Sequence, residues 1–254
     1  MAKIISLVNQ KGGTAKTTTT VNLGAYLAAM GKYVLLIDLD PQANATSGVG
    51  VNRQDTDKTL YHILANQASF EEIIKKTSLF GYDMVPSSAD LAGAVVELIN
   101  DPRREFKLFD VLQNIRTNYD YILIDCPPYL GLLTINGLTA ADSVIIPVQC
   151  EYYALEGLSQ LLKTIQLVKE NLGSDVGVMG ALLTMYDKRN RLAREVVKEV
   201  RLNFPGKVFD AIIPRCVRLA EAPSFGQTIL QFDIKSAGAK AYRQLAEEII
   251  NLET

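Results

Sequence analysis

The stretch QKGGTAKTT at residues 10–18 follows a short apolar run, residues 4–8, and leads into a segment with helical spacing, residues 16–30. Its two glycines allow a tight turn that brings backbone N–H groups close to a ligand, and the following helix presents unpaired N–H groups and the positive end of its dipole. These features are typical of an anion site. The stretch departs from the usual phosphate-loop pattern G-x-x-x-x-G-K-[ST], because Gln10 and Ala15 stand at the two glycine positions.

Lys16 and Thr17 carry the chemistry expected of a nucleotide site. The Lys16 ammonium is a point charge that suits the outer phosphates, and the Thr17 hydroxyl can serve as a ligand to Mg²⁺. A tight turn with a solvated lysine is the structural alternative, but the Lys-Thr-Thr that directly follows the glycines favours nucleotide binding. The string G-x-G-x-x-G, which a dinucleotide-binding fold would carry after its first strand, is absent.

Length and composition predict a single domain over residues 1–254. Hydrophobic residues make up 48% of the chain and charged residues 21%, which is close to ordinary globular usage. The first apolar run is too short for a signal peptide or a membrane span, so we expect a cytoplasmic protein. Three widely spaced cysteines without a C-x-x-C pair indicate buried or unreactive thiols rather than a disulfide framework or a metal cluster.

Strand-length apolar runs alternate with helical segments, which predicts the α/β class, with a doubly wound, mostly parallel sheet flanked by helices. In such sheets ligands bind at the carboxyl ends of the strands. The predicted strands are 4–8, 33–37, 121–124, 143–148, 176–183 and 208–212, and the predicted helices are 16–30, 89–99, 103–117, 154–172, 192–204 and 238–252.

Two acidic signals follow predicted strands. Asp38 and Asp40 lie in LLIDLDPQ, and Asp125 lies in YILIDCPP. Either signal alone would be interpreted as a cap of the following turn. Together with the loop, the acidic residues form a set that is typical of phosphoryl-transfer sites. Asp125 fits the role of holding a metal ion through water, with Asp38 as a further candidate ligand, and Asp40 fits that of orienting or deprotonating an attacking water.

Charge is segregated along the sequence. The formal net charge is −2 and the pI is near 5.6, which excludes a globally basic nucleic-acid-binding protein. Residues 187–218 nevertheless hold nine basic and four acidic side chains, a net of +5, so the remaining chain sums to −7. A partner that carries phosphates is therefore plausible.

At these residues the sequence resembles the ParA/Soj chromosome- and plasmid-partition ATPases, P-loop NTPases of the ParA/MinD group whose deviant Walker A motif reads K-G-G-x-x-K-[ST]. Residues 11–17, KGGTAKT, match that motif in full. The similarity continues through DLDPQANAT, IDCPPYLGLLTINGL, VIIPVQCEYYALEGLSQLL and IIPRCVRLAEAPSFG. The resemblance implies that the protein binds ATP and Mg²⁺ and hydrolyses ATP.

The resemblance also assigns a role to Lys11. In this family the lysine reaches across a dimer interface to phosphates held by the partner subunit, so ATP binding and homodimer formation are coupled. We accordingly expect Lys11, Lys16, Asp40 and Asp125 to act in catalysis. The expected nucleotide contacts are Lys11, Gly12, Gly13, Thr14, Ala15, Lys16, Thr17, Thr18, Pro214 and Cys216.

Two positions depart from the family pattern. Glycine is common where this chain has Ala15, and we expect that position to be near-helical and to tolerate the methyl group. The family usually reads Pro-Arg-Asn where this chain reads Pro-Arg-Cys at residues 214–216. Backbone groups there could still contact adenine.

The resemblance and the basic segment together predict non-specific binding to double-stranded DNA and association with the nucleoid. Family members contact DNA through basic side chains at the positions of Arg189 and Arg218, and Lys188 and Arg191 are weaker candidates. No helix-turn-helix precedes the P-loop, so we expect no sequence preference. The second expected partner is a ParB-like centromere-binding protein.

Two other functional classes remain as alternatives. A MinD-like spatial regulator would dock on the membrane through a basic amphipathic C-terminal helix. Here residues 240–254 hold two basic and three acidic side chains, so we expect a packed helix and no membrane binding. A metabolic P-loop enzyme would need a substrate pocket with its own acid and base, and no residues in the sequence suggest one.

Overall fold

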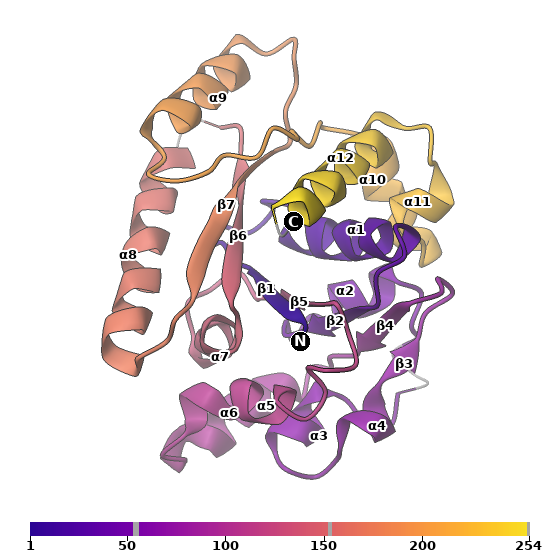
Figure 1. Cartoon of the computed structure of the whole chain (residues 1–254), viewed down its shortest axis with the longest axis vertical. Helices are drawn as coiled ribbons and strands as arrows, with labels where there is room; N and C mark the ends of the chain where they lie inside the picture. The colour runs from indigo at the N-terminus through magenta and orange to yellow at the C-terminus, as the bar shows by residue number, and fades with distance from the viewer. Residues whose placement is uncertain (53–55, 152–153, 253–254) are drawn as a thin grey trace.

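A seven-stranded sheet forms the centre of the molecule (Figure 1). The computed structural model describes residues 1–52, 56–151 and 154–252, and the side chains of all of these except 154–156. The strand order is β3-β4-β2-β5-β1-β6-β7, and every neighbouring pair is parallel except β3 and β4. The strands are β1 (Lys3–Leu7), β2 (Val34–Asp38), β3 (Lys75–Lys76), β4 (Tyr82–Val85), β5 (Tyr121–Asp125), β6 (Ser143–Gln149) and β7 (Gly177–Thr184).

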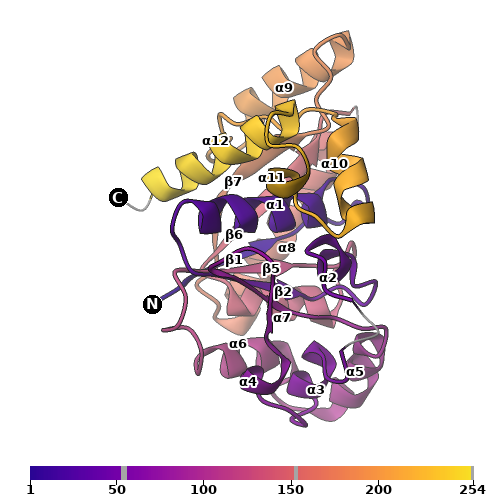
Figure 2. The ribbon, with the colours of Figure 1, turned by 90° about the vertical axis from the view of Figure 1, so that its right-hand side faces the viewer.

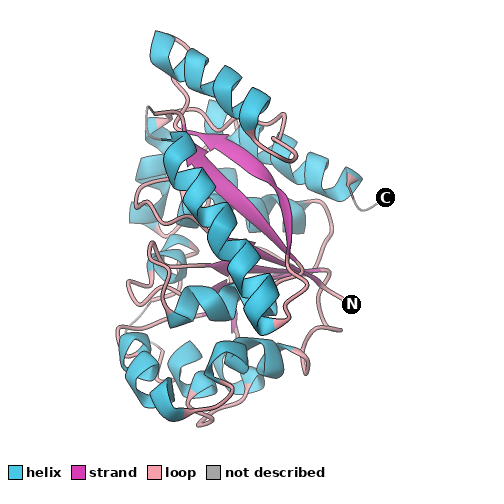
Figure 3. Ribbon diagram, turned by 90° about the vertical axis from the view of Figure 1, so that its left-hand side faces the viewer, coloured by secondary structure: helices cyan, strands magenta, loops and turns pink. Residues whose placement is uncertain are grey.

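Helices cover both faces of the sheet, as Figures 1 and 2 show. One face carries α1 (Lys16–Ala29), α2 (Asn44–Gly48), α10 (Val217–Glu221), α11 (Ile229–Phe232) and α12 (Ala237–Asn251). The opposite face carries α3 (Leu60–Leu64), α4 (Phe70–Ile73), α5 (Leu91–Glu97), α6 (Lys107–Leu112), α7 (Leu132–Ala140), α8 (Ala154–Leu172) and α9 (Arg191–Asn203). Figure 3 shows the long helix α8 in front of the strands at the β6–β7 edge of the sheet. Within the described residues, no helix has both the length and the apolar character needed to cross a bilayer.

The doubly wound, mostly parallel sheet predicted from the sequence is confirmed. Five of the six predicted strands and the long helices at both ends of the chain form close to their expected bounds. Part of the quoted family similarity, Tyr152 and Tyr153, lies outside the described residues, as do Glu253 and Thr254.

The predicted strand at 208–212 is wrong. Only a single bridge joins Val208 to Ala181 of β7. The next backbone N–H groups, those of Asp210 and Ala211, donate instead to the Glu248 carboxylate of α12 at 3.1 and 2.8 Å. Because these donors are taken by a side chain, the ladder does not extend into a strand.

Several elements were not predicted. The short strand β4 reads YDMV, and its Asp83 interrupts the apolar run, although all four residues are buried. Helix α7 reads LLTINGLTA and is buried on most of its surface, so it lacks the one-sided apolar pattern of a surface helix. The predicted helix at 103–117 is broken into a 3₁₀ turn (Arg104–Phe106) and α6.

The P-loop helix α1 lies against the sheet beneath α12. Residues 19–28 of this helix are all buried, so only small or apolar side chains fit most of its surface. At Gly24 the backbone comes so close to β4 that an added Cβ atom would lie 2.5 Å from the Tyr82 hydroxyl. That hydroxyl donates to the Val21 carbonyl at 3.0 Å, which fixes its position.

We predict that Gly24→Ala lowers the free energy of unfolding by about 1–3 kcal/mol, because the methyl group overpacks a buried contact. The matched control is Gly93→Ala in α5, where no atom lies within 4 Å of the added Cβ. That substitution should raise stability by up to about 1 kcal/mol, since alanine is the better helix former. Urea denaturation of both variants checks the packing, and equal effects at the two sites would contradict it.

Candidate functional site

The loop between β1 and α1 contains two residues in the left-handed conformation, Gly13 at φ 74° and Ala15 at φ 69° and ψ 30°. The expectation that Ala15 is near-helical is therefore wrong. An alanine in this region carries a steric cost between its Cβ and the backbone. The family's usual glycine at this position follows from the conformation, and Ala15 adopts it although it is not the favoured residue.

Lys16 is buried at the start of α1, and its Nζ donates to the Lys11 carbonyl at 3.2 Å. The Thr14 hydroxyl donates to the same carbonyl at 3.3 Å, so both side chains hold the loop in a closed turn. On the other side, the Thr184 hydroxyl at the end of β7 donates to the Thr14 carbonyl at 3.0 Å. Contacts within the chain thus define the shape of the loop.

Asp125 joins the end of β5 to the start of α1. Its Oδ2 accepts from the Thr17 hydroxyl at 2.7 Å, and its Oδ1 accepts from the Thr20 hydroxyl at 3.1 Å. The carboxylate is fully buried, so these donors compensate part of the cost of its desolvation. The contact places Asp125 directly behind the hydroxyl that the sequence predicted as a Mg²⁺ ligand.

Asp38, the register partner of Asp125 on β2, is also fully buried. Its Oδ2 accepts from the backbone N–H and the hydroxyl of Thr46, both at 2.8 Å, and its Oδ1 accepts from the Asp40 N–H at 3.1 Å. The role of Asp38 in the structure is thus to anchor α2 and the loop that carries Asp40. It does not line the P-loop pocket, so its predicted role as a metal ligand gains no support from the structure.

The buried charges shift one another's protonation. Burial raises the pKa of the Asp125 carboxyl above its usual range, the charge of Asp38 raises it further, and the hydrogen bonds from Thr17 and Thr20 oppose the shift. Burial also raises the pKa of Asp38 and lowers that of Lys16. Negative charge here is incompletely compensated by the protein. The oxygen atoms present, the Thr17 hydroxyl and the Asp125 carboxylate behind it, fit a hard divalent cation such as Mg²⁺.

A pocket of 380 Å³ opens above this arrangement. Asp40 lies in its wall, largely buried, and its Oδ1 accepts from the Gln42 N–H at 3.0 Å. A carboxylate in this place can orient a water molecule or take its proton. The lining residues are Gly12, Gly13, Ala15, Lys16, Thr17, Thr18, Asp40, Gln42, Asn44, Pro128 and Met185.

A second pocket of 410 Å³ adjoins the first, because Ala15, Thr18 and Met185 line both. Its wall includes Pro214 and Cys216, the two residues expected beside the base of a nucleotide. Most other lining side chains are apolar, among them Ile213, Val217, Leu219 and Tyr242. A pocket walled by the P-loop with Lys16, Thr17 and Asp40, beside one lined mainly by apolar side chains, matches the two ends of a nucleotide.

Lys11 points away from the pocket that its own loop forms. It is absent from the lining of that pocket, and its Nζ lies 3.0 Å from Oε2 of Glu151, just after β6. Both side chains are about half exposed, at 52% and 48%. The side chain of Lys11 is therefore available at the surface, whereas Lys16 is committed to the interior.

Two loops bring the predicted DNA-contacting residues to the same side of the molecule. The Tyr186 N–H donates to the Ile213 carbonyl at 3.1 Å, and the Arg215 N–H donates to the Tyr186 carbonyl at 2.9 Å. The loop after β7 and the segment before α10 are thereby joined. Exposed basic side chains lie on these two segments, at Lys188, Arg189 and Arg215, and on the helices that follow them, at Arg191 in α9 and Arg218 in α10.

Three of these cations have local carboxylate partners. Arg189 pairs with Asp187 at 2.8 Å, Arg191 pairs with Glu195 at 2.9 Å, and Arg218 pairs with Glu221 at 2.9 Å. Lys188 has no carboxylate within ion-pair distance in the part of the chain that the structure describes. Exposed pairs of this kind are weak, so phosphates can displace the carboxylates.

Comparison with known proteins agrees with the site. A family model described as an AAA domain matches residues 2–178. The sporulation initiation inhibitor protein Soj of Bacillus subtilis is 54% identical to this chain, over 98% of both chains. The chromosome partitioning protein ParA of Caulobacter vibrioides is 50% identical, over 99% of this chain and 95% of its own. This chain belongs to the ParA/Soj family.

A solved structure of a ParA/Soj-like fold carries the ligands that the site suggests. The cobyrinic acid a,c-diamide synthase of Mycobacterium smegmatis, solved with a bound ATP analogue and magnesium, is 36% identical, with a TM-score of 0.87 over 99% of this chain and 95% of its own. The resemblance drawn from the P-loop, the two acidic signals and the later motifs is thus confirmed at the level of family and fold.

Sequence reasoning missed several residues of this ParA/Soj site. Met185 lines both pockets and has a left-handed backbone, at φ 54°. A methionine in the sequence gives no indication of that conformation. Thr20 and Thr46 hold the two buried aspartates. Thr46 stands 8 positions after Asp38, in the motif DLDPQANAT, so a hydroxyl close in sequence to a buried carboxylate could have indicated it. Thr20 lies 105 positions from Asp125, and no local pattern pairs these two residues.

We predict that Ala15→Gly raises the free energy of unfolding by about 1 kcal/mol, because relief of left-handed strain exceeds the added entropy of the unfolded chain. The control is Ala92→Gly at an exposed position of α5, which should lower stability by about 1 kcal/mol. Urea titration measures both. A loss of stability at both positions would show that Ala15 is not left-handed.

Proposed function

We propose that this protein is an ATP-dependent dimerising switch that binds DNA without sequence preference in its ATP form, hydrolyses ATP, and drives chromosome or plasmid segregation with a ParB-like partner. The observation that carries the proposal is the different placement of the two lysine side chains of one loop. Lys16 is buried beneath the pocket, whereas Lys11 is exposed and directed away from it. A second copy of the chain would supply each pocket with a second cation, beside its own Lys16.

ATP would bind with its phosphates on the P-loop and its base in the apolar second pocket. The N–H groups at the start of α1 and the Lys16 ammonium would bind the phosphate oxygens. The Thr17 hydroxyl, held by Asp125, would be a direct Mg²⁺ ligand. When bound, Mg²⁺ neutralises charge on the phosphate oxygens.

Hydrolysis follows from the position of Asp40. Its carboxylate orients a water molecule, whose oxygen forms a bond to the γ-phosphorus while the bond from that phosphorus to the bridging oxygen of ADP breaks. The proton lost by the water passes to Asp40 or to the departing phosphate, and ADP leaves with the electron pair of the broken bond. The Asp38 carboxylate supports this step indirectly, because it holds the Asp40 N–H.

The Lys11 ammonium of one protomer would neutralise phosphate oxygens in the other. A cation supplied in trans to a phosphoryl group contributes on the order of 10³–10⁵ in rate. ATP offers the terminal phosphate that both subunits can hold, and ADP does not. The dimer should therefore form with ATP and loosen after hydrolysis.

DNA binding is supported by the basic side chains on the two joined loops and on the first turns of α9 and α10 that follow them. Lys and Arg bind DNA phosphates independently of sequence, with affinity that falls steeply as salt rises. In a dimer the basic loops of two protomers would contribute to one surface, so nucleotide state would control DNA affinity. DNA and a ParB-like partner would in turn stimulate hydrolysis, and the ATP form would associate with the nucleoid.

The membrane-docking alternative is less well supported. The buried face of α12 packs against α1 and the sheet through Tyr242, Leu245 and Ile249. A helix bound in this way has no free apolar face to insert into a bilayer. The metabolic alternative is supported by the similarity to a synthase, but the titratable side chains among the described residues that line the P-loop pocket, Lys16 and Asp40, both have roles with ATP, and none is left for another substrate.

We predict that Arg218→Glu abolishes ATP-dependent retention on DNA while ATP binding survives. Reversal of one charge in each protomer removes a phosphate contact and adds a repulsion at the proposed surface. The matched control is Arg243→Glu on α12, because Arg243 is also exposed and also pairs with a carboxylate on its own helix. Co-sedimentation with DNA and with liposomes, with ATP or ADP across a salt series, measures both.

The wild-type chain and the Arg243 variant should sediment with DNA only in ATP and at low salt. Retention of the Arg218 variant on DNA at low salt would contradict the assigned surface. Sedimentation of the wild-type chain with anionic liposomes instead of DNA would support the MinD-like alternative.

A further inference from the structure

The exposed ion pair between Lys11 and Glu151 occupies the ammonium that the proposed function sends to the partner subunit. The Lys11 Nζ lies 3.0 Å from Glu151 Oε2, and the other carboxylate oxygen, Oε1, accepts from the Gln149 side chain at 2.7 Å. Glu151 thus holds a fixed orientation toward the loop. Its only cation among the described residues is the one that the proposed mechanism sends to the partner subunit.

Both ends of this ion pair rest on a rigid frame. The Lys11 N–H donates to Oδ1 of Asn9 at 2.9 Å, and Nδ2 of the same Asn9 donates to the Pro147 carbonyl in β6 at 2.7 Å. The Cys150 N–H donates to the Thr184 carbonyl at 3.0 Å, which fixes the chain immediately before Glu151. Since the two backbones are already held together, the pair forms with little loss of backbone freedom.

We propose that Glu151 is a positioning residue that holds the Lys11 side chain in the monomer and thereby opposes formation of the ATP-bound dimer. The inference rests on the proposed function, in which Lys11 acts across the dimer interface. An ammonium bound to a carboxylate of its own chain must give up that contact before it can reach a phosphate of the partner. The ligand's attraction for the Lys11 ammonium must therefore exceed that of the Glu151 carboxylate.

The charge of the bound nucleotide decides whether Lys11 leaves Glu151. A γ-phosphate held by the P-loop carries more negative charge than one carboxylate and should draw the ammonium away from Glu151. A site that holds ADP offers weaker attraction at that position, so Lys11 should remain with Glu151. In this way the ion pair would sharpen the difference between the two nucleotides, because it penalises dimers that lack the terminal phosphate.

The size of the effect follows from the exposure of the pair. One half-exposed ion pair changes an equilibrium constant by roughly 1.4- to 5-fold, and a symmetric dimer would break two of them. Removal of the carboxylate charge should therefore tighten the ATP dimer by roughly 2- to 30-fold.

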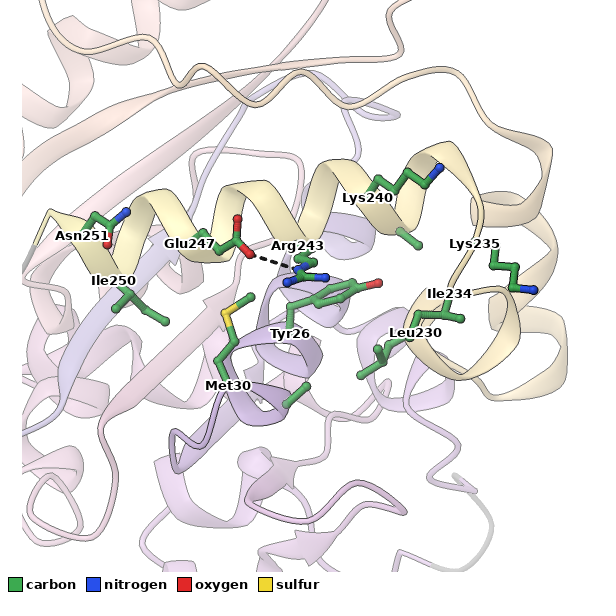
Figure 4. A pocket seen from close by; sticks show the side chains of 12 residues that line it. Tyr26, Met30, Leu230, Ile234, Lys235, Lys240, Arg243, Glu247, Ile250 and Asn251 are labelled. Atoms are coloured by element: carbon green, nitrogen blue, oxygen red, sulfur yellow. Dashed lines mark hydrogen bonds and ion pairs between the residues drawn. The ribbon is translucent and has the colours of Figure 1, made fainter.

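The test compares Glu151→Gln with a matched control, Glu247→Gln. Glu247 pairs with Arg243 on α12 at 2.9 Å, and the exposure of the two side chains, 68% for Arg243 and 49% for Glu247, resembles that of the Lys11 pair. Figure 4 shows this control pair in the groove between α12 and α1, among residues that do not line the P-loop pocket. Both substitutions remove one negative charge from an exposed pair.

Analytical ultracentrifugation over a range of protein concentrations gives the dimer dissociation constant with saturating ATP and Mg²⁺, and again with ADP. We expect Glu151→Gln to lower that constant in ATP by 2- to 30-fold and to increase dimer formation in ADP, whereas Glu247→Gln leaves both unchanged. ATP affinity, measured by fluorescence at protein concentrations where the chain is monomeric, should be the same in all three proteins. A changed monomer affinity would show that Glu151 acts on the phosphates directly and would overturn the proposal.

An unchanged or weaker dimer in Glu151→Gln, with a wild-type chain that dimerises in ATP, would refute the restraint on Lys11 and leave the proposed function standing. A wild-type chain that stays monomeric in ATP would refute the proposed function itself. Thermal unfolding of the three proteins identifies any loss of folding, and the conservative Glu151→Asp variant, which keeps the charge, should dimerise more like the wild type than like Glu151→Gln.

Discussion

The contact between Asp125 and the first turn of α1 is the constraint on which the site depends. A carboxylate at the end of a central strand cannot be buried without donors, and here the hydroxyls of Thr17 and Thr20 supply them. Their bonds set the position of α1 on the sheet and therefore aim the helix N-terminus at the pocket. The same geometry presents Thr17 to a cation and leaves Lys16 beneath the loop.

The two lysines of the loop stand in different surroundings, Lys16 in the interior and Lys11 at the surface. The interior already buries the charged groups of Asp38, Asp125 and Lys16, and burial of a second ammonium there would cost further desolvation. Lys11 stands outside, on a loop segment that Asn9 fixes to β6. Under the proposed function the nucleotide site would be complete only with a cation from another molecule, so association would depend on the ligand, as a switch requires.

Residue types and local patterns were sufficient to predict the class of fold and most of the phosphate site. Buried parallel strands appear in the sequence as uninterrupted apolar runs. The P-loop and the two acidic signals could be recognised from residue types alone, because their chemistry does not depend on how the core packs. Conformation and long-range pairing were not predictable in the same way. Alanine shows no preference that would reveal the left-handed backbone at Ala15, and the partner of Lys11 lies 140 positions away in the sequence. The segment 208–212 failed as a strand because its donors are captured by Glu248, a contact that only the folded chain brings about.

Complementation between two inactive variants tests the central claim, that Lys11 acts in the partner's site, most directly. Lys11→Ala lacks the cation and Asp40→Ala lacks the group that orients water, so each homodimer should be inactive. An equimolar mixture should recover about a quarter of wild-type ATP hydrolysis, since half of randomly formed dimers are mixed and each mixed dimer holds one complete site. A mixture that is no more active than its separate components, although mixed dimers form, would show that Lys11 serves its own site and would contradict the account.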